Sequence, residues 1–366
     1  MKALVLAGGV GTRLRPLSPA MPKQLVPVAN KPVLFYCLES LRDAGIAEAG
    51  IIVGDRGTQI RQAVGSGERF GLRATYIPQD APLGLAHCVL VARSFLGDDD
   101  FVMYLGDNML AGGIAAYADA FRCSRPDALV LLAKVEDPAE YGIATLDESG
   151  HVTAVEEKPR QASSDLAMTG VYFFRPSVHE AIAGIRPSGR GELEITDAIQ
   201  WMIAAGMDVR ARVHSGYWKD TGRIDDLLDC NRVFLDTIGT LIAGQVDDAT
   251  HISGPVVVEP GARVRRSHLR GPLIIGTGST VVNSTVGPFT SLGRGCLVVD
   301  AAIEQSIALD GCSVRRVRGI SKSIIGRSAH VNGASPGSPG HRLIIGDDCH
   351  IMVAPPRAFE AIPTSP

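Results

Sequence analysis

The feature that most restricts the fold of this chain is a six-residue repeat of apolar side chains in its last third. The repeat begins near His251, and its first nine apolar positions are Ile252, Val258, Val264, Leu269, Ile275, Val281, Val286, Leu292 and Val298. One hexad spans one flat face of a three-sided β-helix, so each apolar residue points inward and stacks on the coils above and below. We therefore expect a left-handed parallel β-helix of roughly five or six coils.

The repeat places this β-helix at residues 250–353, with an irregular stretch between Glu304 and Lys322. Residues 335–340 alternate Ser, Pro and Gly and are expected to form a loop. The last coil is expected from Leu343 to Met352, and a loose tail over 354–366. The letters at 333–337 match the GxSxG hydrolase motif, but that motif requires a strand, a strained turn and a helix, so we reject it.

The first two thirds of the chain have a different period. Strand-like apolar runs begin at Ala3, Gly50, Phe101, Ala128 and Gly170, and helix-like segments cover about 32–44 and 84–96. This alternation predicts an α/β domain over residues 1–240, with a Rossmann-like mixed, mainly parallel sheet covered on both faces. In such sheets ligands bind beyond the carboxyl ends of the strands. A helix over about 222–242 is expected to join the two domains.

The charge of the chain is small but unevenly distributed. The net charge of −3 argues against a general nucleic-acid-binding protein. Residues 1–249 carry 24 basic and 32 acidic side chains, a net of −8, whereas residues 250–366 carry 12 and 7, a net of +5. Much of the basic excess lies at Arg263, Arg265, Arg266, Arg270, Arg315, Arg316, Arg318 and Lys322. We interpret these side chains as solvated turn residues, with a subunit contact or an anion site as the alternative.

The cysteines and the apolar runs predict a cytoplasmic protein that does not bind a membrane. Seven cysteines without a CxxC pair indicate reduced thiols rather than a disulfide framework. No apolar stretch reaches the roughly 18 residues that a membrane helix needs. The apolar run Ala3 to Ala7 is too short for a signal peptide, and we interpret it as a buried strand.

A glycine-rich turn, LAGGVGTRLRP, occupies residues 6–16 directly after that strand. Three glycines allow its backbone to turn tightly and to bring N–H groups close to a phosphate. Arg13 adds a forked cation for phosphate oxygens, and Lys23 follows at a distance that reaches the same site. Leu14 stands where the dinucleotide-binding fingerprint needs glycine, and the chain has no Gly-Lys pair for a P-loop.

Three acidic residues at the ends of segments are candidates for metal and sugar binding. Asp107 ends an apolar run in YLGDN, and Asp220 lies in YWKDTG before the joining helix. Each could cap a turn by itself, but together they suit Mg²⁺, which takes one or two carboxylates plus phosphates. In VEEKP, Glu157 could accept hydrogen bonds from sugar hydroxyls, and Lys158 could pair with a sugar phosphate.

Taken in order, LAGGVGTRLRP, KQLVPVANKP, YLGDN, EEKP, RGELEITD and WKDTG resemble the sugar-phosphate nucleotidyltransferases over residues 1–240. The segment PQDAPLGLAHC and the hexads resemble the long-form glucose-1-phosphate thymidylyltransferases of that family. The resemblance implies an enzyme that catalyses the Mg²⁺-dependent transfer of a deoxythymidylyl group from dTTP to glucose 1-phosphate. The products would be pyrophosphate and dTDP-glucose for deoxysugar biosynthesis, and the enzyme is expected to be a homo-oligomer.

The resemblance also implies roles for individual residues. The residues implied in nucleotide binding are Leu6, Gly8, Gly9, Gly11, Thr12, Arg13, Gln79 and Gly84. Those implied in sugar-phosphate binding are Gly142, Glu157, Lys158, Thr169 and Gly170. Asp107 and Asp220 match the metal-binding pair, and the catalytic cations are Arg13, Lys23 and Lys158. His87 and Lys219 receive no role.

Three alternatives follow from the residues. Thymine and uracil differ by one methyl group, worth about 1–3 kcal/mol in a pocket, so UTP or another sugar phosphate stays open. By analogy, left-handed β-helices often carry acyl-CoA chemistry, which would need a general base. The histidines available for it are His251, His268, His330 and His350. A regulatory subunit with an inactive catalytic domain conflicts with the intact charged residues of the motifs.

Overall fold

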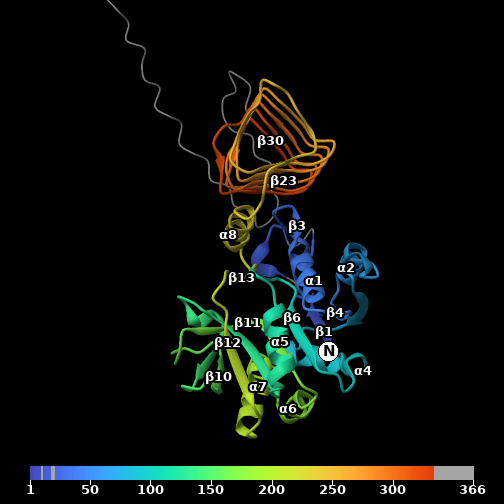
Figure 1. Cartoon of the computed structure of the whole chain (residues 1–366), viewed down its shortest axis with the longest axis vertical. Helices are drawn as coiled ribbons and strands as arrows, with labels where there is room; N and C mark the ends of the chain where they lie inside the picture. Colours follow the sequence, from blue (N-terminus) through green and yellow to red (C-terminus); the bar gives the residue numbers. More distant parts are fainter. Residues whose placement is uncertain (10, 18–20, 334–366) are drawn as a thin grey trace, which may run out of the picture.

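The computed structural model describes residues 1–9, 11–17 and 21–333 of the 366-residue chain. Figure 1 shows an α/β domain that contains the N-terminus and a triangular β-helix, with α8 between them. The predicted fold class is confirmed. The expected loop at 335–340, the last coil, the tail and His350 lie outside the described residues.

The sheet of the N-terminal domain is mixed. Its strand order is β10-β9-β11-β6-β1-β4-β5, and β8 joins β11 to β12. The strands are β1 (Lys2–Leu6), β4 (Glu48–Val53), β5 (Arg73–Pro78), β6 (Phe101–Leu105), β8 (Ala128–Lys134), β9 (Gly142–Leu146), β10 (Val152–Glu157), β11 (Leu166–Phe174) and β12 (Val209–Val213). Strands β6, β1, β4 and β5 run parallel, whereas β11 runs antiparallel to β6, β8 and β9. The glycine-rich turn follows the central parallel strand.

Helices cover both faces of this sheet. They are α1 (Val33–Asp43), α2 (Gly57–Val64), α3 (Leu85–Val91), α4 (Arg93–Leu96), α5 (Ala115–Ser124), α6 (Val178–Gly184), α7 (Ile195–Ala204) and α8 (Ile224–Leu235), with 3-10 turns η1 (Thr12–Leu14), η2 (Lys23–Leu25), η3 (Glu68–Phe70) and η4 (Pro138–Glu140). Leu4 and Met103 pack on the face with α3, α6 and α7, whereas their neighbours Val5 and Val102 pack on the face with α1 and α5. Burial on both faces explains why these strands are continuous apolar runs.

The second domain consists of three parallel stacks of short strands, as the hexads predict. The stacks are β14-β17-β20-β23-β26-β29, β15-β18-β21-β24-β27-β30 and β16-β19-β22-β25-β28. Their strands are β14 (Leu241–Ile242), β15 (Gln245–Val246), β16 (His251–Ser253), β17 (Val256–Val258), β18 (Arg263–Arg265), β19 (His268–Arg270), β20 (Leu273–Ile275), β21 (Thr280–Val282), β22 (Thr285–Val286), β23 (Thr290–Leu292), β24 (Leu297–Val299), β25 (Ala302–Glu304), β26 (Ile307–Ala308), β27 (Ser313–Arg315), β28 (Ile320–Ser321), β29 (Ile324–Ile325) and β30 (His330–Asn332).

Residues in register on successive coils are mostly 17 positions apart. Ile252 is paired with Leu269, and Leu269 with Val286. The irregular stretch has a physical cause, because Leu292 is paired with Ala308 and that coil is one residue shorter. The column of inward apolar residues continues through it.

In the structure the β-helix begins at Leu241 rather than at residue 250, where the sequence predicted it. Strand β14 pairs with β17 and β15 pairs with β18, so the first coil precedes the visible repeat. This coil has a neighbour on only one side. Leu241, Ile242 and Ile252 are consequently 61%, 42% and 39% exposed.

The two domains share a buried junction. Leu227 of α8 packs in one apolar cluster with Ile307 of the β-helix. The side-chain carbonyl of Asn231 accepts hydrogen bonds from the backbone N–H of Ala29 at 2.9 Å and from the hydroxyl of Ser291 at 2.7 Å. These contacts hold the β-helix against the N-terminal domain.

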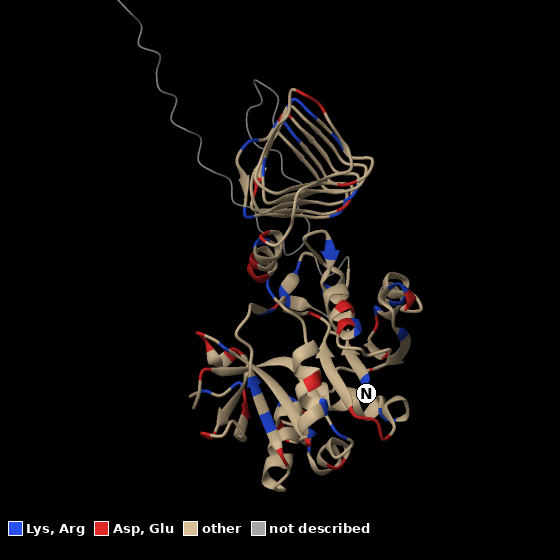
Figure 2. Cartoon of the chain, viewed as in Figure 1, with Lys and Arg blue, Asp and Glu red and all other residues tan. Residues whose placement is uncertain are grey.

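Charged side chains of the β-helix lie mainly along its edges, whereas its flat faces carry few of them (Figure 2). Arg266, Arg316, Arg318 and Lys322 lie between strands, whereas Arg263, Arg265, Arg270 and Arg315 lie at strand ends. The interpretation of the eight basic residues as turn residues is therefore only half right. Within the part of the chain that the structure describes, no helix is long and apolar enough to cross a membrane.

Candidate active site

The turn after β1 closes over the side chain of Lys23. Leu6 ends the strand, and Thr12 begins η1 after Gly11, whose φ is +70°. A Cβ atom on Gly9 would lie 2.9 Å from Cε of Lys23, and one on Gly11 would lie 3.0 Å from its Cβ. Because only glycine leaves this space free, the turn and the lysine come together as the sequence predicts.

A two-stranded ladder brings the two aspartates together. Strand β7 (Asn108–Leu110) pairs antiparallel with β13 (Trp218–Asp220), and Asp220 is opposite Asn108. Thr221 donates hydrogen bonds from its N–H and its hydroxyl to the carbonyl oxygen of Asp107, at 3.0 and 2.7 Å. The ladder and the bonds of Thr221 therefore fix the backbone at Asp107 and at Asp220, and so place the two carboxylates near each other.

The carboxylates form a charged centre with one buried ammonium. Lys23 forms an ion pair with Asp107. Burial lowers the pKa of Lys23, but Asp107 and Asp220 outweigh it and hold the pKa above its ordinary value. Burial and the neighbouring Asp107 raise the pKa of Asp220 to about 6, against the effect of Lys23 and Arg13.

The donor set fits a magnesium ion. Oδ1 of Asp220 is buried and has no hydrogen-bond partner among the described residues. Two crowded carboxylates with an unpaired oxygen suit a divalent cation, because such a cation relieves their repulsion. No group of three or more His, Cys, Asp or Glu side chains in the described chain could hold a metal ion. Mg²⁺ needs only one or two carboxylates, since phosphate and water supply its other ligands.

Arg13 faces the same centre from η1. Its side chain is 55% exposed, and its Nη1 lies 3.5 Å from Oε2 of Glu140. The other oxygen of Glu140 lies 3.1 Å from Nη2 of Arg223. A Cβ atom on Gly222 would lie 3.4 Å from Nη2 of Arg13 and 3.3 Å from Oδ1 of Asp220, so both groups border the same space. The sequence did not single out Glu140, which belongs to no motif.

The loop between β5 and α3 stands beside the glycine-rich turn. Nε2 of Gln79 donates to the carbonyl of Gly84 at 3.3 Å and lies 3.0 Å from Nδ1 of His87. A Cβ atom on Gly8 would lie 3.7 Å from Oε1 of Gln79. Gly84 has φ +101°, and a Cβ there would lie 2.7 Å from the backbone nitrogen of Leu193. The two residues expected to read the base are thus adjacent, and His87 joins them.

Gly142 and Glu157 are partners across the β9–β10 hairpin. A Cβ atom on Gly142 would lie 2.9 Å from Cγ2 of Thr196 and 3.1 Å from Oε2 of Glu157, so glycine keeps this position open. Lys158 follows with φ +45° and an exposed side chain, and its N–H donates to the carbonyl of Tyr141 at 3.0 Å. The carboxylate and the ammonium of the EEKP motif therefore leave the end of the same strand.

Arg190, from the RGELEITD motif, holds Glu157 in place. Its Nη2 lies 3.2 Å from Oε1 of Glu157 and 2.9 Å from Oε1 of Glu194. Burial and the neighbouring Glu194 raise the pKa of Glu157, although Arg190 and Lys158 act in the opposite direction. The role of Arg190 was not predicted, because its partner Glu157 is 33 positions away in the sequence.

Thr169 and Gly170 form an irregularity in β11, where the pairing register shifts. Gly170 has φ +76°, and a Cβ there would lie 2.7 Å from Cδ1 of Leu105. The hydroxyl of Thr169 is buried and donates to the carbonyl of Leu131 at 3.0 Å. Its carbonyl accepts a hydrogen bond from Nε1 of Trp218 at 3.0 Å, which ties this irregularity to the strand of Asp220.

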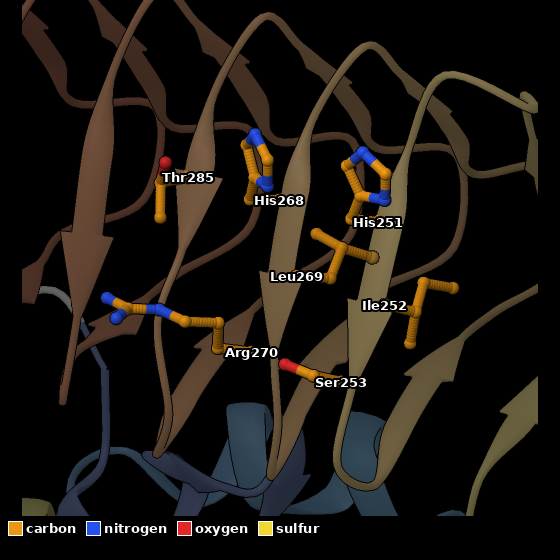
Figure 3. A pocket seen from close by; sticks show the side chains of 7 residues that line it. All are labelled: His251, Ile252, Ser253, His268, Leu269, Arg270 and Thr285. Atoms are coloured by element: carbon orange, nitrogen blue, oxygen red, sulfur yellow. The ribbon is translucent and has the colours of Figure 1, made fainter.

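A separate cavity of about 430 Å³ lies on the β-helix (Figure 3). It is lined by His251, Ile252, Ser253, His268, Leu269, Arg270 and Thr285. The rings of His251 and His268 stack with their centroids 5.2 Å apart. Neither imidazole has a carboxylate partner among the described residues, so no acidic group orients either ring as a general base. Acyl transfer at this cavity stays an alternative without further support.

The chain was compared with known proteins. Residues 2–237 match the sequence model described as nucleotidyl transferase. The chain is 54% identical over 354 residues to a glucose-1-phosphate thymidylyltransferase of Streptomyces griseus, covering 97% of this chain and 100% of the relative. A Streptomyces antibioticus protein with the same name is 51% identical over 354 residues, covering 96% and 99%.

Among solved structures, a candidate glucose-1-phosphate thymidylyltransferase from Bacillus anthracis in complex with sucrose aligns with a TM-score of 0.60 and 35% identity. The alignment covers 64% of this chain and 94% of that one. The matched segment 2–237 contains the glycine-rich turn, both aspartates and the EEKP motif. The chain therefore belongs to the nucleotidyl transferase family.

Proposed function

We propose that this enzyme transfers the deoxythymidylyl group of dTTP to glucose 1-phosphate and releases pyrophosphate. The observation that carries the proposal is the arrangement of Asp107, Asp220 and Lys23 beneath the glycine-rich turn, with one carboxylate oxygen left unpaired. The two Streptomyces relatives support the choice of substrates, because both have this named activity and both match almost the whole chain.

The reaction needs no general base. The phosphate of the sugar is mostly ionised near neutral pH, since its second pKa is about 6. One of its oxygens attacks the α-phosphorus of the nucleotide. The bond from that phosphorus to the bridging oxygen breaks, and pyrophosphate leaves with the electron pair. The obstacles are repulsion between two anions and the charge that develops on the leaving group.

The cations of the site address these obstacles. Asp107 and Asp220 would hold Mg²⁺, which supplies positive charge to the phosphates when it is bound. Lys23 and Arg13 would bind the triphosphate from the side of the glycine-rich turn, and Lys158 would bind the sugar phosphate. Holding both reactants in line removes much of the entropic part of the barrier.

Hydrogen-bonding contacts would select the substrates. Glu157 stands where its carboxylate can accept hydrogen bonds from sugar hydroxyls, and Gly142 leaves room beside it. The carbonyl oxygen of the Gln79 amide offers an acceptor for the edge of a pyrimidine, while its N–H groups contact the carbonyl of Gly84 and the ring of His87. We place the enzyme in the cytoplasm and in deoxysugar supply. The six described cysteines, which are free thiols, agree with that location.

The experiment that tests this function is a pyrophosphate-release assay with Mg²⁺ and glucose 1-phosphate. dTTP, UTP, GTP, CTP and ATP are offered separately, and an Asp107→Asn variant is the inactive control. Strong preference for dTTP is the expected result. Equal or better use of UTP keeps the family and the mechanism but changes the product. No release with any nucleotide, and none with amino sugar or mannose phosphates, contradicts the proposal and favours a regulatory subunit.

A further inference from the structure

A cleft of about 340 Å³ lies where the β-helix meets the N-terminal domain. Phe35 of α1, Gln62 of α2 and Arg69 of η3 line one side, and Arg294 and Arg327 of the β-helix line the other. None of these residues belongs to the active site described above. The volume is within the usual range for small-molecule sites.

Among the described residues, no carboxylate forms an ion pair with the arginines of this cleft. The side chains of Arg294 and Arg327 are exposed and make no ion pair or hydrogen bond within the described part of the chain. Arg69 lies over the ring of Phe35, 4.2 Å from its centroid, and its one hydrogen bond to described residues goes to the carbonyl of Ala63. Most of the guanidinium donors therefore remain available to a ligand.

Two carboxylates also line the cleft, and both are fixed on turns of the β-helix. Oδ1 of Asp310 accepts a hydrogen bond from the backbone N–H of Arg294 at 2.8 Å. Oε2 of Glu259 accepts from the N–H and the hydroxyl of Thr277, at 2.8 and 2.7 Å. The lining of the cleft thus contains three guanidinium groups, those of Arg69, Arg294 and Arg327, and two carboxylates. The cleft therefore carries a net positive charge.

The cleft also reaches the short turn that positions Lys23. Leu25 lines the cleft and belongs with Lys23 to the three-residue turn η2, and Pro27 follows two residues later. The side chain of Lys23 packs beneath Gly9 and forms the ion pair in the active site. A ligand in contact with Leu25 would therefore displace turn η2, and with it the ammonium group of Lys23.

We propose that the interdomain cleft binds a phosphorylated small molecule through Arg69, Arg294 and Arg327, and that its occupancy changes the affinity of the active site for nucleotide. Guanidinium groups approaching from both walls match the several oxygens of a phosphate, each of which can accept a forked pair of donors. The coupling is reciprocal, so bound nucleotide also changes the affinity of the cleft. Only the coupling between the cleft and the nucleotide site rests on the proposed function; the binding of a ligand in the cleft does not.

Binding is measured first, by calorimetry on the full chain. Inorganic phosphate and ribose 5-phosphate are the probes, and chloride at equal ionic strength controls for screening. The Arg294→Ala/Arg327→Ala double variant is compared with wild type and with Arg318→Ala, which removes an exposed arginine outside the cleft. Replacing Arg294 by alanine retains its backbone N–H and hence the bond to Asp310.

We expect the double variant to bind at least one probe ten or more times more weakly, and Arg318→Ala to bind like wild type. The cations of the active site can also bind phosphate, and they are unchanged in wild type, in the double variant and in Arg318→Ala. The test is therefore the difference in probe affinity between these proteins. Tighter binding of ribose 5-phosphate indicates a phosphorylated metabolite as the ligand, and equal binding indicates phosphate itself. A double variant that binds both probes like wild type overturns the site.

The coupling is measured as the KM for dTTP with and without the better probe. At least a threefold change is expected in wild type and in Arg318→Ala, and none in the double variant. Binding without any change in KM or kcat overturns the coupling. If the chain proves inactive with every nucleotide, the calorimetric comparison still decides whether the cleft is a site, so the two proposals fail separately.

Discussion

At the scale of single residues, the active site depends on one buried ammonium between two carboxylates. Asp220 is half-buried beside Asp107, and its partial burial together with the charge of Asp107 raises its pKa to about 6. Lys23 compensates part of the repulsion between the two carboxylates through its ion pair with Asp107. A divalent cation would complete the compensation, because it brings two positive charges to the same space.

Replacing either aspartate should remove activity and leave the fold. In Asp107→Asn or Asp220→Asn, the amide keeps the shape of the side chain but removes one of the two charges. We expect kcat to fall on the order of 10²–10³-fold, as for other charge-stabilising groups in active sites. Pyrophosphate release measures the loss, and circular dichroism during heating checks the fold. Asp225→Asn on the exposed face of α8 is the matched control. Turnover near the wild-type rate would remove that aspartate from the metal-binding role.

The sugar site should show a pH dependence that belongs to Glu157. Burial and Glu194 raise the pKa of this carboxyl, so as pH falls it becomes protonated before an exposed glutamate, whose pKa is about 4.3, would do so. The protonated carboxyl accepts hydrogen bonds from sugar hydroxyls less well. We therefore expect the KM for glucose 1-phosphate to rise as pH falls, beginning above the ordinary glutamate range.

Glu157→Gln separates this effect from the titration of the substrate. The neutral amide should give a high KM at neutral pH and leave only the pH dependence of the sugar phosphate, near its second pKa of about 6. Steady-state kinetics at each pH, at constant ionic strength, provide the comparison. If the variant keeps the wild-type pH profile of KM, Glu157 does not bind the sugar in the way proposed.

At the scale of elements, the loop that is expected to read the base is fastened by a distant segment. The N–H of Leu193 donates to the carbonyl of Leu83 at 2.8 Å, and the N–H of Ala86 donates to the carbonyl of Leu193 at 3.0 Å. Gly84 lies inside this pair of bonds. Its lack of a side chain is what allows the two backbones to come so close.

Gly84→Ala should weaken nucleotide binding. The added Cβ would collide with the backbone of Leu193 and push the loop away from Gln79. We expect at least a tenfold rise in the KM for dTTP, with a smaller change in kcat. Gly97→Ala is the matched control, because Gly97 also has positive φ, at +59°, but its Cβ position has nothing within 4 Å. Equal effects of the two substitutions would show that backbone strain, and not the collision, is responsible.

Periodicity made the elements of the β-helix predictable, but not its first coil. Leu269 stands out in the sequence because coils on both sides bury it, whereas Leu241 meets a neighbour on one side only and belongs to a two-residue strand. The ladder of β7 and β13 could not be predicted either, since three residues are too few to show a period.

The candidate site was partly predictable for a similar reason. Asp107 and Asp220 could be paired in advance by their chemistry, because each lies in a recognisable motif. Glu140 and Arg190 could not be assigned a role, because each is a charged residue whose partners are distant in sequence. Glu140 meets Arg13 across 127 positions, and only the assembled sheet brings them together.

At the scale of the whole molecule, the β-helix leaves its first coil open. Solenoid ends need a cap, because the terminal repeat otherwise exposes the side chains that inner repeats bury. Here Leu241, Ile242 and Ile252 are exposed at that end. The predicted homo-oligomer could cover this surface with a second copy of the chain.

Polar substitutions at this end should lower the molecular mass in solution. We expect wild type to exceed the 38.6 kDa of one chain in light scattering coupled to size exclusion. The Leu241→Ser/Ile242→Ser double variant should shift toward the monomer, because its exposed apolar area is smaller. Val213→Ser, at a residue that is 45% exposed on the N-terminal domain, is the control. An unchanged mass in the double variant would place any oligomer contact elsewhere.

One segment, residues 188–194, touches the surroundings of both substrates. Leu193 fastens the loop of Gly84, while Arg190, which is itself paired with Glu194, holds Glu157. Ordering this segment for one substrate lowers the entropic cost of ordering it for the other. The two substrates should therefore bind with synergy, by the same factor in either order, as thermodynamic linkage requires. An enzyme built in this way commits dTTP to reaction mainly when its sugar acceptor is already present, which protects the nucleotide from wasteful hydrolysis.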